Sequence, residues 1–488
     1  MHVTILYAIA YASTISLILL WKAWNLIVLR ARERFLSVVS RWLFYTVVFP
    51  RARGSTDATI FSVALAILFA VGNIVGSTLA VQTKAELSMR LARLSILNMV
   101  VLFVGGRTNI VIDKLLKWTI TEYSFLHRWI GRVSLVEALL HGLLYYLDRR
   151  SINAYEISLL AVTAAIGCMS FVYVRRRIYE TFLSTHRLLS FAVLILSWLH
   201  ITHLGLFSLV CLISAVTLFS IQKILWLGFF LYRNLGSGPR CEATLVRYPN
   251  TFGTEEIVQL QVSLKRPWNV RPGQYVYLSL RQPAYFWSGI VESHPYMVAW
   301  ASDSDDASSH VITLLVQCRR GFSRRLSLTR MRASTPQHMS ASIDGPYGGA
   351  GLEKLQDYDK VLFMADGIGI AHHLMPVRHL LVSHNKQTAR IRRLTLIWFL
   401  RSRDQMCWAV NFLLALHDLD DRKILNIFIT TPSSLEGSAE GRNSALPELR
   451  SRIYMLNEID IDLWINEEWQ AEAGNMLTVG KYYSPYSS

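Results

Sequence analysis

The chain has 488 residues, of which 52% are hydrophobic, and its 50 Lys and Arg against 34 Asp and Glu give a formal net charge of +16. It is too long for one ordinary domain and too apolar for a purely soluble protein. Because the positive charge lies in short loops beside apolar segments and no nucleic-acid motif is present, we expect a lipid bilayer as partner and no nucleic acid. The five cysteines are scattered without a C-x-x-C pair, which supports neither a disulfide framework nor a zinc or iron–sulfur site.

Seven apolar segments predict a multi-pass membrane domain. The first lacks a basic n-region and a clear cleavage site, so we interpret it as a membrane helix and not as a signal peptide. The third is short and could be extended by its flanks. With the N-terminus outside, most Lys and Arg residues of the loops lie in the cytosol, and so do the C-terminal domains. The segments are residues 3–28, 58–81, 91–105, 125–147, 157–174, 185–203 and 206–231.

The stretch from Phe35 to Pro50 is the main ambiguity of this topology. It is apolar but short, carries Arg41 at its centre and stops at a proline. We therefore predict that it lies in the membrane interface. If it crosses the bilayer instead, the N-terminus moves inside.

Two of the apolar segments each carry a histidine pair with the same spacing. His127 and His141 are fourteen residues apart in the fourth segment, and so are His186 and His200 in the sixth. Fourteen residues of α-helix rise about 21 Å and complete nearly four turns, so each pair lies on one face at two depths. A lone histidine in an apolar helix is usually a satisfied core residue, but four at a repeated spacing fit two irons with two axial imidazoles each. His203 is the rival for the outer position, although its spacing from His186 does not match.

Three arginines, Arg107, Arg128 and Arg132, stand at the predicted inner boundary of the membrane domain. Two interpretations have equal weight. The side chains could extend towards lipid phosphates, or they could pair with haem propionates, which suit the geometry of arginine.

The second half of the sequence predicts a small antiparallel β-barrel. Hydropathy falls after Arg233, and NLGSGPR is typical of a linker. From Cys241 to about Ile343, short alternating runs are divided by Pro and Gly. Its H-P-Y motif at 294–296 is no more than a turn when taken alone, but an aromatic residue there could pack on a flavin. Arg319 and the 321–323 backbone could face a pyrophosphate.

From Tyr358 the pattern changes to strand, glycine turn and helix, in KVLFMADGIGIAHHL. A parallel strand that ends at a glycine turn before a helix offers free backbone N–H groups to phosphates. A second strand, RLTLIWFL, a helix around 405–417 and a third strand, ILNIFIT, continue the alternation. G-I-G alone is a weak motif, but here the strand and helix that it requires are present.

The ordered set of motifs resembles the ferric reductase and NADPH oxidase family of membrane flavocytochromes. The set comprises GRTN at 106–109, HRWIGR at 127–132, the two histidine pairs, HPYM, GFS, DGPYG and DGIGIA. The stretch IWFLRSRDQMCW is most similar to the fungal metalloreductase branch. The resemblance implies a polytopic α-helical membrane domain with a bis-haem bundle, an antiparallel FAD-binding β-barrel and a ferredoxin reductase-like α/β domain for NADPH. The domains would be 1–57 (first helix and linker), 58–232 (haem domain), 233–345 (FAD domain) and 346–488 (NADPH domain).

Members of this family pass electrons from cytosolic NADPH to FAD, then through an inner and an outer haem b to an outside acceptor. For this chain the resemblance implies an iron(III)-chelate reductase that acts on Fe(III) or Cu(II) chelates, in the plasma membrane, beside an iron permease and oxidase system. His127 and His186 match the inner haem ligands, and His141 and His200 the outer ones. The flavin residues would be His294, Pro295, Tyr296, Met297, Arg319, Gly321 and Ser323, and the nucleotide residues Gly345, Pro346, Gly367, Gly369 and Arg401.

Three departures from the family pattern put the reductase half in doubt. Met297 replaces a Ser or Thr whose hydroxyl could bond the flavin. Asp366 places a carboxylate where it would repel the phosphates of a bound nucleotide. Arg401 and Arg403 could compensate for this repulsion by binding the 2′-phosphate of NADPH. Alternatively, the two arginines are ordinary exposed surface charges. After GNMLTVG, which we predict to be the last parallel strand, KYYSPYSS replaces the family's cysteine–glycine turn. Either the NADPH domain is truncated or its hydride step is impaired.

Two alternatives to a metalloreductase therefore stay open. One is a superoxide-forming oxidase, in which oxygen reacts near the outer haem. The other is a haem-binding membrane protein whose NADPH reductase activity is impaired.

Overall fold

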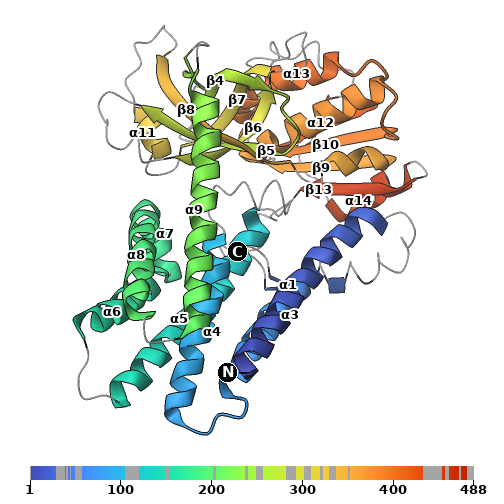
Figure 1. Cartoon of the computed structure of the whole chain (residues 1–488). Helices are drawn as coiled ribbons and strands as arrows, with labels where there is room; N and C mark the ends of the chain where they lie inside the picture. The colour runs from blue at the N-terminus through green and yellow to red at the C-terminus, as the bar shows by residue number, and fades with distance from the viewer. Residues whose placement is uncertain are drawn as a thin grey trace. The chain divides into compact units, whose positions relative to one another are not determined.

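In the computed structural model the chain divides into two compact units, Met1–Trp226 and Leu227–Ser488 (Figure 1). The structure describes residues 2–28, 39, 42–43, 46–49, 58–104, 120–148, 153–201, 205–236, 240–248, 257–281, 293–301, 309–318, 322–328, 337–349, 352–431, 453–456, 461–471 and 474–480.

The first unit is helical. Six of its described helices are long and apolar enough to cross a membrane, and α6 is shorter. Each of the seven predicted segments corresponds to a helix. The helices are α1 (His2–Val28), α3 (Ile60–Thr78), α4 (Lys84–Val104), α5 (Ile120–Asp148), α6 (Ala154–Met169), α7 (Val172–Arg177), α8 (Tyr179–His200) and α9 (Leu206–Asn234), of which α9 continues into the second unit.

Helix α4 shows how flanking residues lengthen a short apolar segment. The backbone N–H of Glu86 donates to Thr83 Oγ1 (3.1 Å), and Glu86 Oε1 pairs with Arg90 Nη2 one turn later (2.6 Å). A capping hydroxyl and an i,i+4 ion pair both stabilise the first turns of a helix. The helix therefore begins at Lys84, earlier than apolar residues alone predict.

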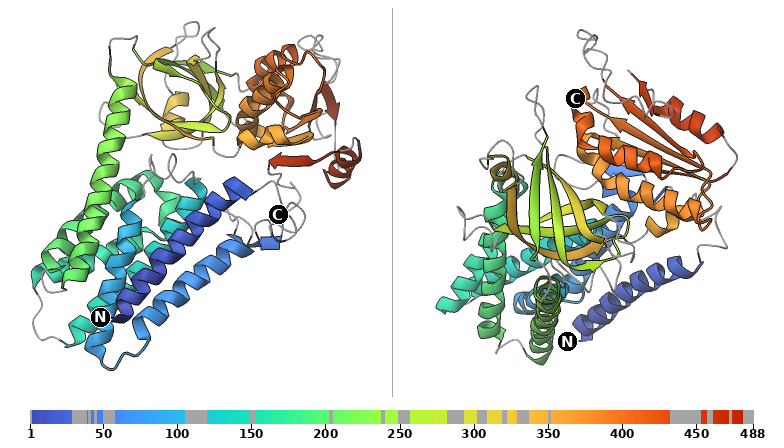
Figure 2. Two further views of the ribbon diagram at one scale, coloured as in Figure 1. Left: turned by 45° about the vertical axis from the view of Figure 1, so that its right-hand side comes forward. Right: turned by 90° about the horizontal axis from the view of Figure 1, so that it is seen from above.

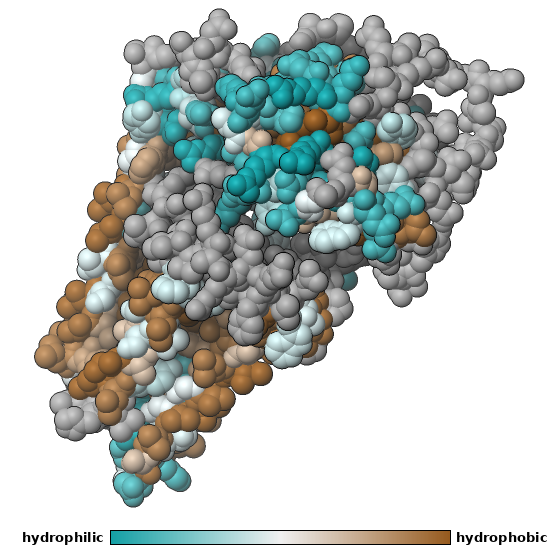
Figure 3. All heavy atoms as spheres, turned by 90° about the vertical axis from the view of Figure 1, so that its right-hand side faces the viewer, coloured by the Kyte–Doolittle hydropathy of each residue, from teal (hydrophilic) through white to brown (hydrophobic). Residues whose placement is uncertain are grey.

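The helical unit is apolar on the outside and buries polar residues among its apolar core residues. Leu147, Leu188 and Leu206 are 71%, 70% and 77% exposed, and hydrophobic residues cover the helices in Figure 3. In contrast, Asn98 and Glu137 are buried. This distribution suits a lipid surround, because lipid favours apolar side chains on the outer face and polar residues turned into the bundle.

The predicted interfacial stretch from Phe35 to Pro50 lies mostly outside the described residues. Within it, Val47–Phe49 forms strand β1, which pairs antiparallel with β2 (Ala58–Thr59). Thr59 then caps α3, because its Oγ1 accepts from the Ser62 backbone N–H (3.3 Å).

The second unit begins with the predicted antiparallel barrel, which is confirmed. Six strands close in the order β3-β4-β7-β6-β5-β8, and each pair of neighbours is antiparallel (Figure 2). Strand β8 ends three residues after the predicted domain end at 345. The elements are β3 (Glu242–Arg247), β4 (Ile257–Trp268), β5 (Gln274–Arg281), β6 (His294–Ala301), β7 (Ser309–Gln317), α11 (Phe322–Leu328) and β8 (Gln337–Gly348).

The rest of the unit is the predicted α/β domain. Its five strands are parallel in the order β12-β11-β10-β9-β13, and MLTVG, the main part of the predicted stretch GNMLTVG, forms the last strand. The elements are η5 (Leu352–Asp357), β9 (Lys360–Asp366), η6 (Gly367–Gly369), α12 (Ile370–Asn385), β10 (Arg393–Phe399), η7 (Arg403–Trp408), α13 (Val410–Asp418), β11 (Leu425–Thr430), β12 (Ile453–Leu456), α14 (Ile461–Gln470) and β13 (Met476–Gly480).

Helices cover both faces of this sheet. Alternate residues of a strand point to opposite faces. Val361 and Phe363 of β9 pack in the core that contains α12 and α13, whereas Leu362 and Met364 pack with Trp464 of α14. The chain order of the strands reverses beside β9, which is the position where open α/β sheets bind ligands at the carboxyl ends of their strands.

His373 of α12 provides a pH test of this core. Its Nε2 donates to the Met364 carbonyl oxygen (3.0 Å), and burial, with the neighbouring His372, lowers the pKa of His373 to about 4. Between the ordinary value of about 6.5 and this value, the unfolded chain binds a proton that the folded chain does not. We therefore expect the free energy of unfolding to fall by about 3 kcal/mol as the pH decreases from about 6.5 to 4.

Denaturant unfolding of the full chain in detergent at several pH values measures this fall. The exposed His310 offers the control. His373→Gln should reduce this fall by about the contribution of one histidine, and His310→Gln should leave it unchanged. Equal slopes for the two variants would assign the acid sensitivity to other groups.

Candidate functional site

Helices α5 and α8 bring the four predicted histidines together in two pairs. The ring centroids of His127 and His186 are 6.2 Å apart, and those of His141 and His200 are 6.1 Å apart. In each pair one histidine comes from each helix. His203, the rival of His200, lies outside the described residues.

The separation within each pair fits a metal ion between two imidazoles. With metal–nitrogen bonds of about 2 Å, two rings on opposite sides of one ion have their centres roughly 6 Å apart. Both observed separations match this value. In addition, the buried Nδ1 of His186 has no hydrogen-bond partner in the part of the chain that the structure describes. The chemistry and spacing of both pairs therefore suit bis-imidazole haem ligation.

The other ring nitrogens are held by neighbouring groups. His141 Nδ1 lies 2.9 Å from the Ser88 carbonyl oxygen, to which it can donate, and His127 Nδ1 lies 3.3 Å from Tyr123 Oη. Metal-binding histidines usually donate their second ring N–H to such a partner, which fixes the tautomer and the ring orientation. For His141 this leaves Nε2 available as the ligand.

His200 has a carboxylate as its neighbour. Its Nδ1 lies 3.6 Å from Glu156 Oε1, and this oxygen also accepts from Tyr145 Oη (3.0 Å). Glu156 belongs to the first turn of α6, where Asn153 caps the helix. The sequence patterns did not indicate Glu156, Ser88 or Tyr123, because their role depends on packing between helices.

The arginines of the predicted inner boundary are only partly described. Arg107 lies outside the described residues. Arg128 is half-buried, and the exposed Arg132 places its guanidinium 4.9 Å from the ring centroid of Trp129. Both interpretations of these side chains stay predictions.

At the barrel, two motifs that are 28 residues apart meet in space. The imidazole of His294, at the start of β6, stacks on the ring of Phe322, at the start of α11, with centroids 4.6 Å apart and an interplanar angle of 20°. This stacking brings HPYM next to Phe322 and the half-buried Ser323. Phe322 was not among the predicted flavin residues, and its only signal was its place inside GFS. Arg319 and Gly321 lie outside the described residues.

Strand alternation separates the other residues of HPYM. Pro295 and Met297 lie directly opposite Tyr277 and Tyr275 of β5, so these four side chains share a face of the sheet. Tyr296 is instead partly buried against the barrel core. Met297, which stands where the family usually has Ser or Thr, therefore lies on the face of the sheet that carries Tyr275 and Tyr277.

Gly345 and Pro346 belong to the last barrel strand, β8. They follow Asp344, which pairs with Tyr277 in the sheet register and accepts a hydrogen bond from Tyr347 Oη (2.5 Å). Burial, together with Asp344, raises the pKa of the Tyr347 phenol. The phenol therefore stays a hydrogen-bond donor and fixes the carboxylate beside the glycine.

The glycine turn after β9 leaves open space at the sheet switch point. Gly367 has a φ of +51°, and a Cβ added at Gly367 or Gly369 would meet no atom within 4 Å. The Trp398 Nε1–H donates to the Gly367 carbonyl oxygen (2.8 Å) and so fixes the turn against β10. A rigid glycine turn with free space above it, before a helix N-terminus, suits a phosphate group.

Charged residues of both signs flank this turn. Asp366 lies opposite Phe399 in the parallel register, and the exposed Arg401 follows two residues later at the same edge. The side chain of Arg403 lies outside the described residues. The edge of the sheet at the carboxyl ends of β9 and β10 therefore carries Asp366 and Arg401, two of the charged residues named in the sequence analysis.

Three family models match the chain in this same order. Residues 89–197 match the ferric reductase like transmembrane component, 243–351 an FAD-binding domain, and 358–460 the ferric reductase NAD binding domain. Fold and matches indicate a multi-pass membrane protein with a barrel similar to FAD-binding domains and an α/β domain similar to the NAD-binding domain of ferric reductases. The chain is thus similar to the ferric reductase and NADPH oxidase family, as its motifs predicted.

Curated relatives share only part of their sequence with this chain. The ferric/cupric reductase transmembrane component 2 of Saccharomyces cerevisiae is 24% identical over 284 residues, which are 56% of this chain and 37% of that protein. Ferric reductase transmembrane component 4 of the same yeast is 25% identical over 303 residues, 58% and 38%. A superoxide-generating NADPH oxidase heavy chain of Dictyostelium discoideum is 27% identical over 206 residues, 38% and 29%. The chain spans less than two fifths of the length of these relatives.

Proposed function

We propose that the chain is a transmembrane metalloreductase that moves electrons from cytosolic NADPH, through FAD and two haems b, to Fe(III) or Cu(II) chelates outside. The observation that carries this proposal is the two facing histidine pairs, with centroid separations of 6.2 and 6.1 Å, in one chain with the flavin and nucleotide domains. The names of the yeast relatives support the metal acceptor.

The residues of the helical unit would hold two irons at two depths. His127 and His186 would ligate the inner haem, and His141 and His200 the outer one. Fourteen residues of helix separate the two levels by about 21 Å, which suits a relay across a bilayer roughly 30 Å thick. Ser88, Tyr123 and Glu156 would keep the rings oriented for ligation.

The residues of the second unit would bind the cofactors that deliver electrons to the two haems. FAD, when bound, accepts a hydride from NADPH and releases single electrons, which haem irons carry one at a time. His294, Pro295, Tyr296, Met297, Arg319, Gly321 and Ser323 would hold the flavin. Gly345, Pro346, Gly367, Gly369 and Arg401 would hold the nucleotide, with Gly367 and Gly369 giving the phosphates room.

The positive-inside rule supports a cytosolic second unit. Location in the plasma membrane is a further part of this proposal. On this proposal the outer pair faces the metal, and an iron permease and oxidase system would consume the product. The domain boundaries at 57, 232 and 345 are part of the same proposal.

Difference spectra of membranes test the proposal. We expect NADPH to reduce the haem band of membranes that carry the full chain, and Fe(III) chelate outside to reoxidise it. Superoxide release without Fe(III) reduction would favour the oxidase, which the Dictyostelium relative supports. A haem band that NADPH never reduces would overturn electron delivery by the second unit.

Gly369→Val tests the nucleotide site separately. The new side chain would enter the open space above the turn without a clash, and the φ of −55° at Gly369 suits any residue. We expect unchanged protein stability but at least about tenfold weaker NADPH binding, a loss of about 1.4 kcal/mol. Binding titrations of the full chain measure the affinity, and Gly228→Val, at another open glycine, is the control. Equal affinities of the two variants would contradict the phosphate site.

A further inference from the structure

The helical unit contains a buried polar cluster that the proposed electron relay does not use. Glu137 of α5, Asn98 of α4 and Asn73 of α3 are 5%, 0% and 2% exposed. Asn98 Nδ2 donates to Glu137 Oε2 and to Asn73 Oδ1, both at 2.8 Å. Three helices thus meet through one carboxylate and two carboxamides.

Several polar atoms at this cluster have no hydrogen-bond partner within the described residues. Within the described residues, Glu137 Oε1, Asn98 Oδ1 and the Tyr11 Oη of α1 are buried without a hydrogen-bond partner. Glu137 also has no ion pair there, since Arg90, the buried arginine of α4, is bound to Glu86 and to the Leu79 carbonyl. The cluster therefore contains a carboxylate without a counter-charge.

An ionised carboxylate in an apolar interior is costly unless a positive charge or a proton compensates it. The titratable groups that face Glu137 from the packed helices are Tyr7 and Tyr11 of α1. The other facing groups, Asn73 and Asn98, are neutral amides. The missing compensation must therefore be a proton on Glu137, a bound cation or a positive charge outside the cluster.

The position of Glu137 on α5 indicates which positive charge compensates its carboxylate. Glu137 is four residues before His141, about one helical turn or 6 Å of rise, and ten residues after His127, about 15 Å. Its charge is thus coupled mainly to the His141–His200 pair. The iron–porphyrin core of a ferric haem with two neutral imidazoles, counted without its propionates, carries one net positive charge, which one-electron reduction removes.

We propose that Glu137 is a proton-binding site that compensates for electron arrival at the His141–His200 pair. In the oxidised state the carboxylate balances the positive ferric haem. If the haem core held by His141 and His200 gained one electron, Glu137 would bind one proton from the solvent, so that the sum of the two charges would stay zero. This inference rests on the proposed haem ligation.

Redox titration of the full chain with its haems tests the proposal. We expect the midpoint potential of one haem to fall by about 59 mV per pH unit, the one-electron value for a tenfold change in proton concentration, over part of the range from about pH 5 to 9. Glu137→Gln should remove this dependence and leave haem content unchanged, because the amide oxygen can still accept from Asn98. Glu122→Gln, at an exposed carboxylate on the same helix, should retain it.

Each other outcome contradicts a definite part of the proposal. A wild-type potential independent of pH, or a slope that survives in Glu137→Gln, would overturn it and leave the haem ligation standing. A potential that depends on Na⁺ concentration and not on pH would assign the site to a metal cation and overturn the proton. A protein without bis-imidazole haem spectra would overturn both this proposal and the proposed function.

Discussion

Replacement of His186 by alanine is expected to remove one of two haems from the purified chain. Mutation of a residue that only hydrogen-bonds a metal ligand lowers metal affinity roughly 10- to 100-fold. Loss of the ligand itself should therefore weaken haem binding at least as much. The His141–His200 pair is built from other residues and should keep its haem. Haem per chain should therefore fall by half, and transfer of electrons from NADPH to an outside acceptor should stop.

His203→Ala and His200→Ala supply the matched comparison at the other pair. Since the ring centroid of His200 lies 6.1 Å from that of His141, we expect only His200→Ala to lower haem content. If His203→Ala lowers it and His200→Ala does not, the outer ligand is wrong. Full haem content in His186→Ala would contradict the inner ligand in the same way.

The sequence predicted those features that depend on local composition and spacing. Apolar length located the membrane helices, and the fourteen-residue spacing of His127 and His141 predicted one shared helix face, because a helix repeats every 3.6 residues. Both residues do pair with histidines of α8. Alternation within β4 and the glycine turn after β9 similarly indicated the barrel and the α/β domain. Each of these signals depends on a local stretch of about 20 residues or fewer.

The sequence did not predict contacts that depend on packing between distant segments. Ser88 is 53 residues from His141, and Asn98 is 39 residues from Glu137. Nothing in the local pattern of α4 distinguishes these polar residues from others on the same helix. Similarly, the stacking of His294 on Phe322 requires the closed barrel, which brings β6 next to the segment after β7.

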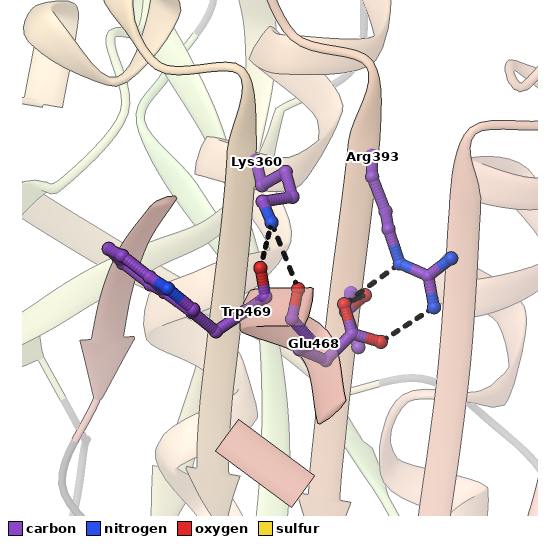
Figure 4. A network of polar contacts seen from close by, with 5 residues as sticks. Lys360, Arg393, Glu468 and Trp469 are labelled. Carbon is purple, nitrogen blue, oxygen red and sulfur yellow. Dashed lines mark hydrogen bonds and ion pairs between the residues drawn. The ribbon is translucent and has the colours of Figure 1, made fainter. Parts of the chain in front are cut away.

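Helix α14 is another element that local patterns did not reveal, and one residue ties it to the sheet. Glu468 accepts from Arg393 Nε (2.8 Å), from Arg393 Nη2 (2.7 Å) and from Thr395 Oγ1 (3.1 Å), as Figure 4 shows for the arginine. Lys360 Nζ donates to the backbone carbonyls of Glu468 (3.1 Å) and Trp469 (2.7 Å). The buried ammonium thus binds the carbonyl end of the helix, where its charge is favourable.

Glu468→Ala is expected to destabilise the second unit by about 3–5 kcal/mol, the cost of breaking a buried ion pair and leaving its partner uncompensated. Glu468 is only 4% exposed, and its loss would leave Arg393 without its bidentate acceptor. The adjacent exposed Glu467 is the control, and Glu467→Ala should change stability by less than about 0.5 kcal/mol. Denaturant unfolding of the full chain in detergent compares the two variants, and equal midpoints would show that α14 adds little to the fold.

The Glu468→Ala variant also distinguishes an effect on the stability of the sheet from an effect on NADPH binding. Lys360 and Arg393 begin β9 and β10, whereas Gly367 and Arg401 follow the ends of these strands. In a parallel sheet those residues lie at opposite edges, about seven residues or 23 Å apart along the strand. Folded Glu468→Ala should therefore bind NADPH with unchanged affinity, whereas Gly369→Val should do the opposite and lose affinity without loss of stability. A parallel loss of both properties in either variant would mean that the two edges of the sheet are coupled.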